Sequence, residues 1–273
     1  MSKSRFILVY PIEKRYGTLV DLNGKIVDRI ELPSLFSYPV RIDIIRRAVL
    51  SALTAKMQPK GRNPLAGKRR VGESWGIGYS IARVPRLDNG RAVLAPNVRG
   101  GRRQFAPTPL KKIHEEINRK EMRIAIISAL AALSNKEIVL KRNYVIPQGI
   151  EYIPIIVVNG FESFATTKEV KEWLRRIELW QNILRSQDST RIRSGKGKMR
   201  GRRYKESKSM LFIVSSLNVP VVKALKNLPG VEYLTPTTMN ILKLAPGGMP
   251  GRLAIITQKA LEKLSEIYVV EKP

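Results

Sequence analysis

The segment YIPIIVV at residues 152–158 is followed by TTKEVKEWLRRI at residues 166–177, and this succession decides the fold. The first run is apolar and rich in β-branched residues, which is typical of a buried strand. The second run begins with a capping box, Thr166-x-x-Glu169. Its apolar residues share one helical face, formed by Val170, Trp173, Leu174 and Ile177. A buried strand that leads into an amphipathic helix is the repeating unit of a parallel α/β sheet.

The same succession recurs further along the chain. Strand-like runs lie at residues 210–214, 231–234 and 253–256. A helix is expected at residues 220–228, where Pro229-Gly230 ends it, and another is expected to bury Ala260, Leu261 and Leu264. The sequence therefore predicts an α/β fold with a mostly parallel sheet and helices packed on it.

The chain opens with β structure and then turns helical. Strands are expected at residues 6–10, 18–20 and 25–30, with Asn23-Gly24 supplying positive φ angles in a tight turn. Two amphipathic helices follow, separated by a long excursion. The first is expected to bury Ile42, Ile45, Val49, Ala52 and Leu53, and the second Met122, Ile126, Ala129, Leu130 and Leu133. We predict one α/β core domain from residues 1–53 and 109–273, with residues 54–108 inserted in it as an extended basic arm.

Positive charge is concentrated in two stretches. Residues 54–108 carry twelve Lys and Arg against two acids, and residues 191–208 carry nine against one, so they hold +18 of the formal net charge of +28. Like charges at this density repel one another and favour a polyanionic partner. Nucleic acid is therefore the predicted partner.

The composition of the first stretch favours RNA. Its many glycines and prolines exclude a long helix and disfavour a continuous strand, so we expect an irregular arm. Trp75, Tyr79 and Phe105 lie among arginines, and flat rings stack on unpaired bases while guanidinium groups clasp phosphates. The alternative is a basic loop that is only solvated, but such a loop does not account for the large aromatic side chain of Trp75.

The second stretch, RIRSGKGKMRGRRYK at residues 191–205, mixes glycine and bases in the same way. Neither stretch is typical of regular secondary structure. The second one is expected to form a basic loop, residues 191–208. A polybasic linker or a membrane-surface patch is the alternative, but the stretch lacks the apolar face of an interfacial helix.

Several site classes are excluded by the sequence. The chain has no cysteine and one histidine, so disulfides and a His/Cys zinc site are ruled out, and we expect no metal and no cofactor. Residues 61–68, GRNPLAGK, differ from a phosphate-binding P-loop in glycine spacing and have Arg69 where Ser or Thr must hold magnesium. No catalytic constellation is found. The apolar runs are too short for a signal peptide or a membrane span, so we expect a soluble, intracellular protein without a membrane partner.

Several motifs carry a resemblance to a known family. They are AGKRR at 66–70, ESWGIG at 73–78, ARVPR at 82–86, VRGGRR at 98–103, SGKGKMRGRR at 194–203 and NILKLAPGGMPGR at 240–252. Together, in this order, they resemble the family of the fourth universal protein of the large ribosomal subunit, in its archaeal or eukaryotic branch. The short end of the chain after Glu271 favours the archaeal form.

The resemblance implies a structural, non-enzymatic constituent of the large ribosomal subunit, located in cytoplasmic ribosomes. Its partners would be large-subunit rRNA, other large-subunit proteins and the nascent peptide, because the arm tip would line the peptide exit tunnel. The tip residues would be Glu73, Ser74, Trp75, Gly76, Gly78 and Tyr79. Many relatives have Gly-Thr-Gly-Arg where this chain has Gly76-Ile77-Gly78-Tyr79, so Tyr79 can stack where others place an arginine. Residues 240–244 are equally consistent with core packing and with RNA contact.

We predict rRNA contacts for eighteen basic side chains of the two stretches: Lys60, Arg62, Lys68, Arg69, Arg70, Arg83, Arg86, Arg91, Arg99, Arg102, Arg103, Arg191, Arg193, Lys196, Lys198, Arg200, Arg202 and Arg203. Two alternatives come from other classes. A nucleotide-using enzyme with an RNA-substrate arm would need a phosphate cradle after a strand, which the sequence lacks. A free RNA chaperone or DNA-compacting protein would not co-sediment with ribosomes.

Overall fold

A computed structural model describes residues 6–7, 13–268 and 270–271. The described chain divides into two compact units. The first unit contains the residues up to Leu53 and those from Glu116 onward, and the second contains Thr54–Glu115. The regular secondary structure lies in the first unit, apart from the last residue of one helix.

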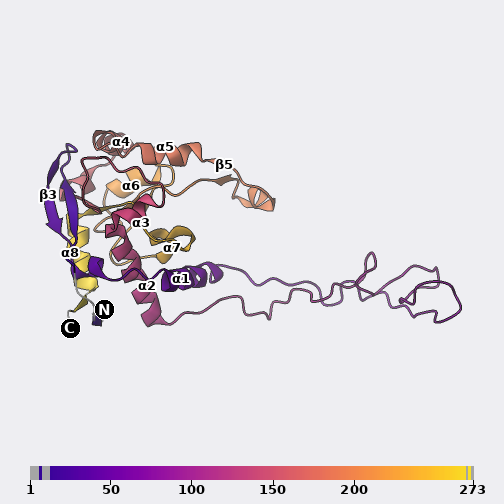
Figure 1. Ribbon diagram of the computed structural model, residues 1–273. Coiled ribbons are helices and arrows are strands. Elements are labelled where there is room, and N and C mark those ends of the chain that lie inside the picture. The colour runs from indigo at the N-terminus through magenta and orange to yellow at the C-terminus, as the bar shows by residue number, and fades with distance from the viewer. Residues whose placement is uncertain (1–5, 8–12, 269, 272–273) are drawn as a thin grey trace. The chain divides into compact units, whose positions relative to one another are not determined.

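A six-stranded sheet forms the centre of the first unit (Figure 1), in the order β3-β2-β4-β9-β7-β8. The strands are β2 (Tyr16–Val20), β3 (Ile26–Glu31), β4 (Ile155–Val157), β7 (Leu211–Ile213), β8 (Glu232–Leu234) and β9 (Ala254–Thr257). All neighbouring pairs are parallel except β2 and β3. The prediction of a mostly parallel α/β sheet is thus confirmed. A separate parallel pair joins β1 (Phe6–Ile7) to β10 (Val270–Glu271).

Helices cover both faces of the sheet. They are α1 (Ile42–Thr54), α2 (Arg119–Ala131), α3 (Lys136–Leu140), α4 (Thr167–Arg176), α5 (Gln181–Asp188), α6 (Val221–Lys226), α7 (Ile241–Leu244) and α8 (Gln258–Ile267). Short 3-10 helices span Ser34–Ser37, Ala132–Ser134, Asn159–Ser163, Lys196–Arg200 and Pro246–Gly248. Buried side chains of α1, α2, α7 and α8 form one apolar cluster, and those of α3 to α6 form the other. Figure 1 accordingly shows α4 and α5 on the side of the sheet away from α1 and α2.

The alternation of side chains along the strands feeds both clusters. Leu19, Ile156, Ile256, Ile213 and Leu234 lie in one row across five paired strands, and all face the cluster of α1, α2, α7 and α8. Their chain neighbours, such as Ile155 and Val157, face the opposite cluster. Strands buried on both faces are why these runs are continuously apolar rather than alternating.

The helix at residues 167–176 forms as its sequence indicates. Thr166 Oγ1 accepts a hydrogen bond from the Glu169 amide, and the Glu169 carboxylate accepts one from the Thr166 amide, so the predicted capping box is confirmed. Val170, Trp173 and Leu174 are buried, as is Ile177 at the end of the helix. The predicted face of α4 is therefore correct.

Two local predictions need correction, and a third falls partly outside the described residues. Only Gly24 has a positive φ in the turn after β2, and the Asp21 amide bonds to Lys25 O, so the loop is longer than a two-residue turn. On α1, Ile42 and Leu53 are exposed rather than inward. The strand expected at residues 6–10 is described only at residues 6–7, and its remaining part lies outside the described residues.

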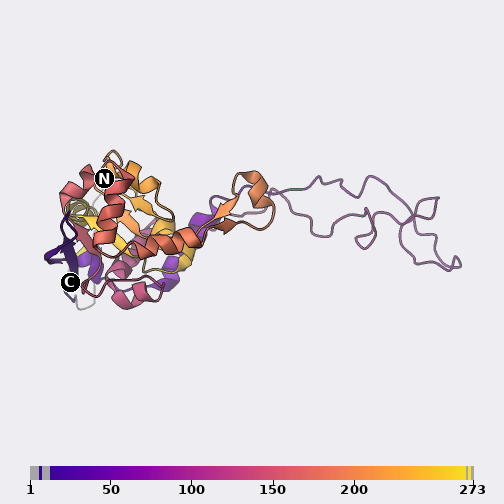
Figure 2. The ribbon, with the colours of Figure 1, turned by 90° about the horizontal axis from the view of Figure 1, so that it is seen from above.

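The second basic stretch also differs from the prediction, because part of it is regular. β5 (Arg191–Ile192) and β6 (Tyr204–Lys205) pair antiparallel and carry a 3-10 helix between them. Gly195 and Gly201, both with positive φ, flank that helix and let the chain reverse. Figure 2 shows this hairpin continuing beyond α5.

Candidate nucleic-acid interface

The second unit is an arm formed by an outgoing and a returning segment. Residues 55–115, all of them described, contain no helix or strand, as their many glycines and prolines predicted. A backbone hydrogen bond joins the two segments, from the Arg62 amide to Pro107 O at 3.2 Å. Further out, a Cβ on Gly67, whose φ is +76°, would lie 2.3 Å from the Gly101 oxygen. Glycine is therefore required at this close approach of the two segments.

Arg86 organises the far part of the arm. Its amide donates to Glu73 O at 2.9 Å, and Arg86 forms isolated bridges to both Glu73 and Ala92. Its guanidinium donates to Gly90 O at 2.8 Å and Ala82 O at 3.4 Å. Three chain segments thus meet at Arg86, and its side chain serves the loop itself. Contact of Arg86 with rRNA stays a prediction.

The loop closed by Glu73 and Arg86 carries the predicted tip. Trp75 and Tyr79 pack together with ring centroids 5.7 Å apart. Gly76 and Gly78 have φ angles of +80° and +95°, and open space surrounds the Cβ position of each. All six predicted tip residues are exposed, and Trp75, at 38%, is less exposed than Tyr79, at 60%. The tip therefore presents a small aromatic cluster on a tightly turned backbone.

Four of the predicted arginines line one hollow in the arm. The hollow has a volume of about 300 Å³ and is lined by Gly67, Arg69, Arg70, Arg91, Val93, Leu94, Arg99 and Gly100. None of these eight residues is acidic. Leu94 has a φ of +63°, in the left-handed region that costs a non-glycine residue about 1–3 kcal/mol. The hollow is thus a cationic site with a strained apolar residue in its wall.

The hairpin at residues 191–205 presents most of its charge outward. Arg193 is half-buried, and its Nε donates to Arg202 O at 3.0 Å. The Arg203 guanidinium lies 5.8 Å from the centre of the Tyr204 ring. The other basic residues predicted here are exposed. Arg193 therefore braces the hairpin and leaves seven charges of the segment on its surface: Arg191, Lys196, Lys198, Arg200, Arg202, Arg203 and Lys205.

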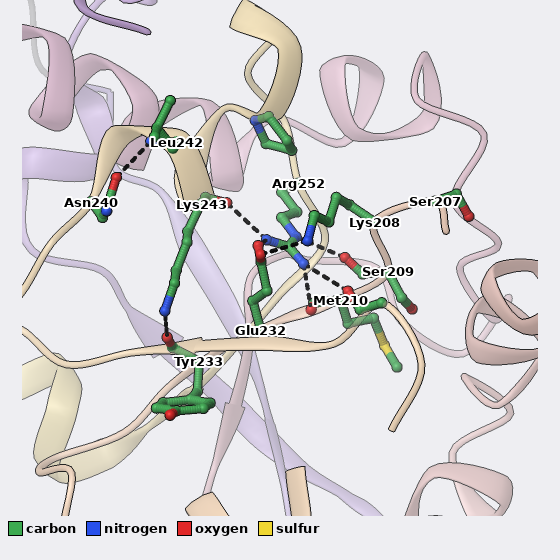
Figure 3. A network of polar contacts seen from close by, with 12 residues as sticks. Ser207, Lys208, Ser209, Met210, Glu232, Tyr233, Asn240, Leu242, Lys243 and Arg252 are labelled. Atoms are coloured by element: carbon green, nitrogen blue, oxygen red, sulfur yellow. Dashed lines mark hydrogen bonds and ion pairs between the residues drawn. The ribbon is translucent and has the colours of Figure 1, made fainter. Parts of the chain in front are cut away.

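The motif at residues 240–252 packs into the core of the first unit (Figure 3). Ile241 and Leu244 are buried, and the Asn240 side chain caps α7 by accepting from the Leu242 amide at 2.9 Å. Lys243 Nζ donates to Tyr233 O at 3.0 Å and lies 5.0 Å from that ring's centre. These contacts are those of core packing, which was one of the two alternatives for residues 240–244 beside RNA contact.

Arg252 is the charged centre of that packing. Its side chain is fully buried and donates to the carbonyls of Ser209, Lys243, Met210 and Gly230 at 2.7, 2.9, 3.1 and 3.1 Å. It also pairs with the Glu232 carboxylate, which Lys208 reaches at 2.7 Å from the outside. Burial raises the pKa of Glu232, but the charges and hydrogen bonds of Arg252 and Lys208 outweigh it, so the pKa lies below its ordinary value.

The described part of the chain offers neither a metal-binding cluster nor a membrane-spanning helix. Its His, Cys, Asp and Glu side chains form no group of three that could hold a metal ion. Among the described helices, none is both long and apolar enough to cross a membrane.

Comparison with known proteins decides the family. The model of the ribosomal protein L4/L1 family matches residues 30–267. The chain belongs to this family. It is 49% identical over 251 residues to the large ribosomal subunit protein uL4 of Sulfurisphaera tokodaii, covering 92% of this chain and 94% of that protein. The uL4 proteins of Pyrobaculum aerophilum and Saccharolobus islandicus are 46% and 45% identical over 259 and 254 residues. These matches cover 94% and 93% of this chain, and 90% and 95% of the relatives.

In this L4/L1 family member, fifteen of the eighteen predicted basic residues are exposed, and Arg86, Arg102 and Arg193 are half-buried. Sequence reasoning did not identify Val93 and Leu94 as part of a site, because a left-handed leucine leaves no trace in composition. It also did not single out Arg252, although the arginine ends one of the motifs that carried the resemblance. Its burial depends on carbonyls that are 9 to 43 positions away in the chain.

Proposed function

We propose that this chain is a structural protein of the large ribosomal subunit that binds large-subunit rRNA through its arm and its hairpin, without catalysis of its own. Membership of the L4/L1 family and the uL4 relatives support the ribosomal assignment. The observation that carries the rRNA assignment is the exposure of fifteen basic side chains on two segments that contain three acids between them. The same assignment implies that the chain contacts other large-subunit proteins and is located in cytoplasmic ribosomes.

The charge on the hairpin can be tested separately from the rest of the chain. Replacing Lys198, Arg200, Arg202 and Arg203 with Gln removes four exposed cations that the hairpin's own hydrogen bonds do not use through their side chains. Each phosphate contact contributes a slope of about −0.7 to −0.9 to log affinity against log salt, so the slope should flatten by about 3. Binding is measured by filter retention with transcripts that together cover the large-subunit rRNA.

The matched control removes four exposed cations elsewhere: Lys25, Lys168, Arg176 and Lys223. Its net charge equals that of the hairpin variant, so general attraction to RNA weakens equally in the two. Equal slopes for the two variants would mean that the hairpin is a solvated segment. If the hairpin contacts rRNA directly, the slope of log affinity against log salt should stay steeper in the control than in the hairpin variant.

The finer proposal is that the arm tip contacts the nascent peptide at the wall of the exit tunnel. The exposed loop with Trp75, Ile77 and Tyr79 offers apolar surface to a passing chain, while the flanking arginines serve as anchors. Photoreactive nascent chains stalled in ribosomes should crosslink within residues 74–80. A deletion of residues 74–79 that retains Glu73 keeps the backbone bond to Arg86 and should abolish these crosslinks while subunits still assemble. Crosslinks that never reach this loop would remove the tunnel proposal and leave the rRNA proposal intact.

A further inference from the structure

The hollow in the arm is larger and less polar than a phosphate site requires. Its volume of about 300 Å³ is at the lower end of the range for small-molecule pockets, which bury most of a ligand. Val93 is 7% exposed and lies in the wall beside Leu94. A bare phosphate gains nothing from an apolar wall, because it would lose hydration without a partner. The wall therefore fits a flat, weakly polar group such as a nucleobase.

The rim of the hollow suits the rest of a nucleotide. Four solvent-exposed arginines line the hollow: Arg69, Arg70, Arg91 and Arg99. A guanidinium group can donate two parallel hydrogen bonds to a phosphate and can also stack on a base. Four such groups, with no acid among the lining residues, match the phosphates on either side of one base.

The backbone holds this arrangement in place. Leu94 keeps a left-handed φ of +63°, and its carbonyl accepts from the Arg102 amide at 3.2 Å. The Val93 amide donates to Pro85 O at 2.8 Å, which ties the wall to the segment that leads to Arg86. Strained backbone of this kind persists where the surroundings impose it, and it is concentrated at binding sites.

We propose that the hollow receives one unstacked rRNA nucleotide, with its base against Val93 and Leu94 and its flanking phosphates held by the four arginines. The proposal rests on rRNA binding by the arm and adds a site for a single base. RNA-binding proteins read RNA chiefly through bases that are splayed out of helices, so the arm would recognise a bulged or looped nucleotide.

The test compares three RNA hairpins that differ at one position: one with a single-nucleotide bulge, one with an abasic ribose in the bulge, and one fully paired. The abasic bulge keeps the phosphates and removes only the base. The full-length protein should bind the bulged hairpin about tenfold or more tightly than the abasic one, which is within the range that stacking of one base provides. Equal binding of these two hairpins would show that the hollow holds phosphates alone and would overturn the proposal.

A matched pair of variants assigns the effect to the hollow. Leu94→Asn removes the apolar side chain and introduces a residue type that tolerates a left-handed backbone. Leu65→Asn makes the same change at an exposed arm position outside the hollow. The preference for the base should fall to about one in Leu94→Asn and persist in Leu65→Asn, with an unchanged salt slope in both. A preference that persists in Leu94→Asn overturns the proposal, whereas a wild-type protein that binds none of the hairpins in a salt-dependent way would contradict rRNA binding by the arm itself.

Discussion

Replacing Arg252 with Met removes the charge at the centre of the core while keeping a side chain of similar length. Three of the four carbonyls that Arg252 contacts keep another donor: Tyr144 Oη for Ser209, the Ser209 amide for Gly230 and the Glu232 amide for Met210. The larger cost therefore arises at Lys243 O and at the Glu232 carboxylate, which lose a donor and a countercharge.

The expected loss is about 3 kcal/mol of unfolding free energy. Removing one partner of a buried ion pair costs about 3–5 kcal/mol, and the lower end applies because Lys208 still reaches Glu232. Domains are stable by about 5–15 kcal/mol, so the variant should remain folded. In urea denaturation, with a slope of about 2–3 kcal/mol per molar, the midpoint should fall by about 1–1.5 M.

Lys208→Met is the matched control, because it removes the other cation from the same carboxylate. Lys208 is 41% exposed, and exposed pairs contribute about 0–1 kcal/mol, so this variant should change the midpoint little. The double variant Arg252→Met, Glu232→Met removes the stranded carboxylate and should regain part of the loss. The reasoning is refuted if Arg252→Met lies within 1 kcal/mol of wild type, or if Lys208→Met costs as much.

Two further predictions concern the same core. Because the pKa of Glu232 is lowered in the folded state, the pair stabilises the fold above the unfolded value of about 4.3, and this contribution is lost as the pH falls through the folded pKa. Urea midpoints between pH 2.5 and 7 should therefore fall less steeply in acid for Glu232→Gln than for wild type, and identical profiles would contradict the linkage. Thr166→Ala should cost about 1 kcal/mol by removing the cap of α4, whereas Thr167→Ala, one position further on, should cost less; equal losses in thermal or urea unfolding would show that the cap contributes nothing.

Local sequence patterns specify much of the architecture. The apolar run at residues 152–158, the capping box at Thr166 and the spacing of Val170, Trp173 and Leu174 each specify an element through interactions within a few residues. The glycine and proline content of residues 55–108 likewise excludes regular structure through backbone sterics alone. Element type and the irregular arm were therefore predictable. The strands expected at residues 152–158 and 210–214 are shorter than predicted, and the second basic stretch forms a hairpin.

The pattern of the residues did not reveal where in space these elements and side chains meet. β9 is the last strand of the sheet in the chain, yet it lies between β4 and β7, an order that depends on how two apolar faces are buried together. The same holds for Arg252, whose partners come from β8, from α7 and from the segments that precede β7 and β8. It also holds for the four arginines that line the hollow with Val93 and Leu94. By itself the sequence determined the kinds of elements, the concentration of charge and the likeness to a family, because these depend on composition and short-range spacing. The tertiary structure alone decided the strand order, the buried ion pair and the hollow, because contacts between distant residues exist only once the chain has packed.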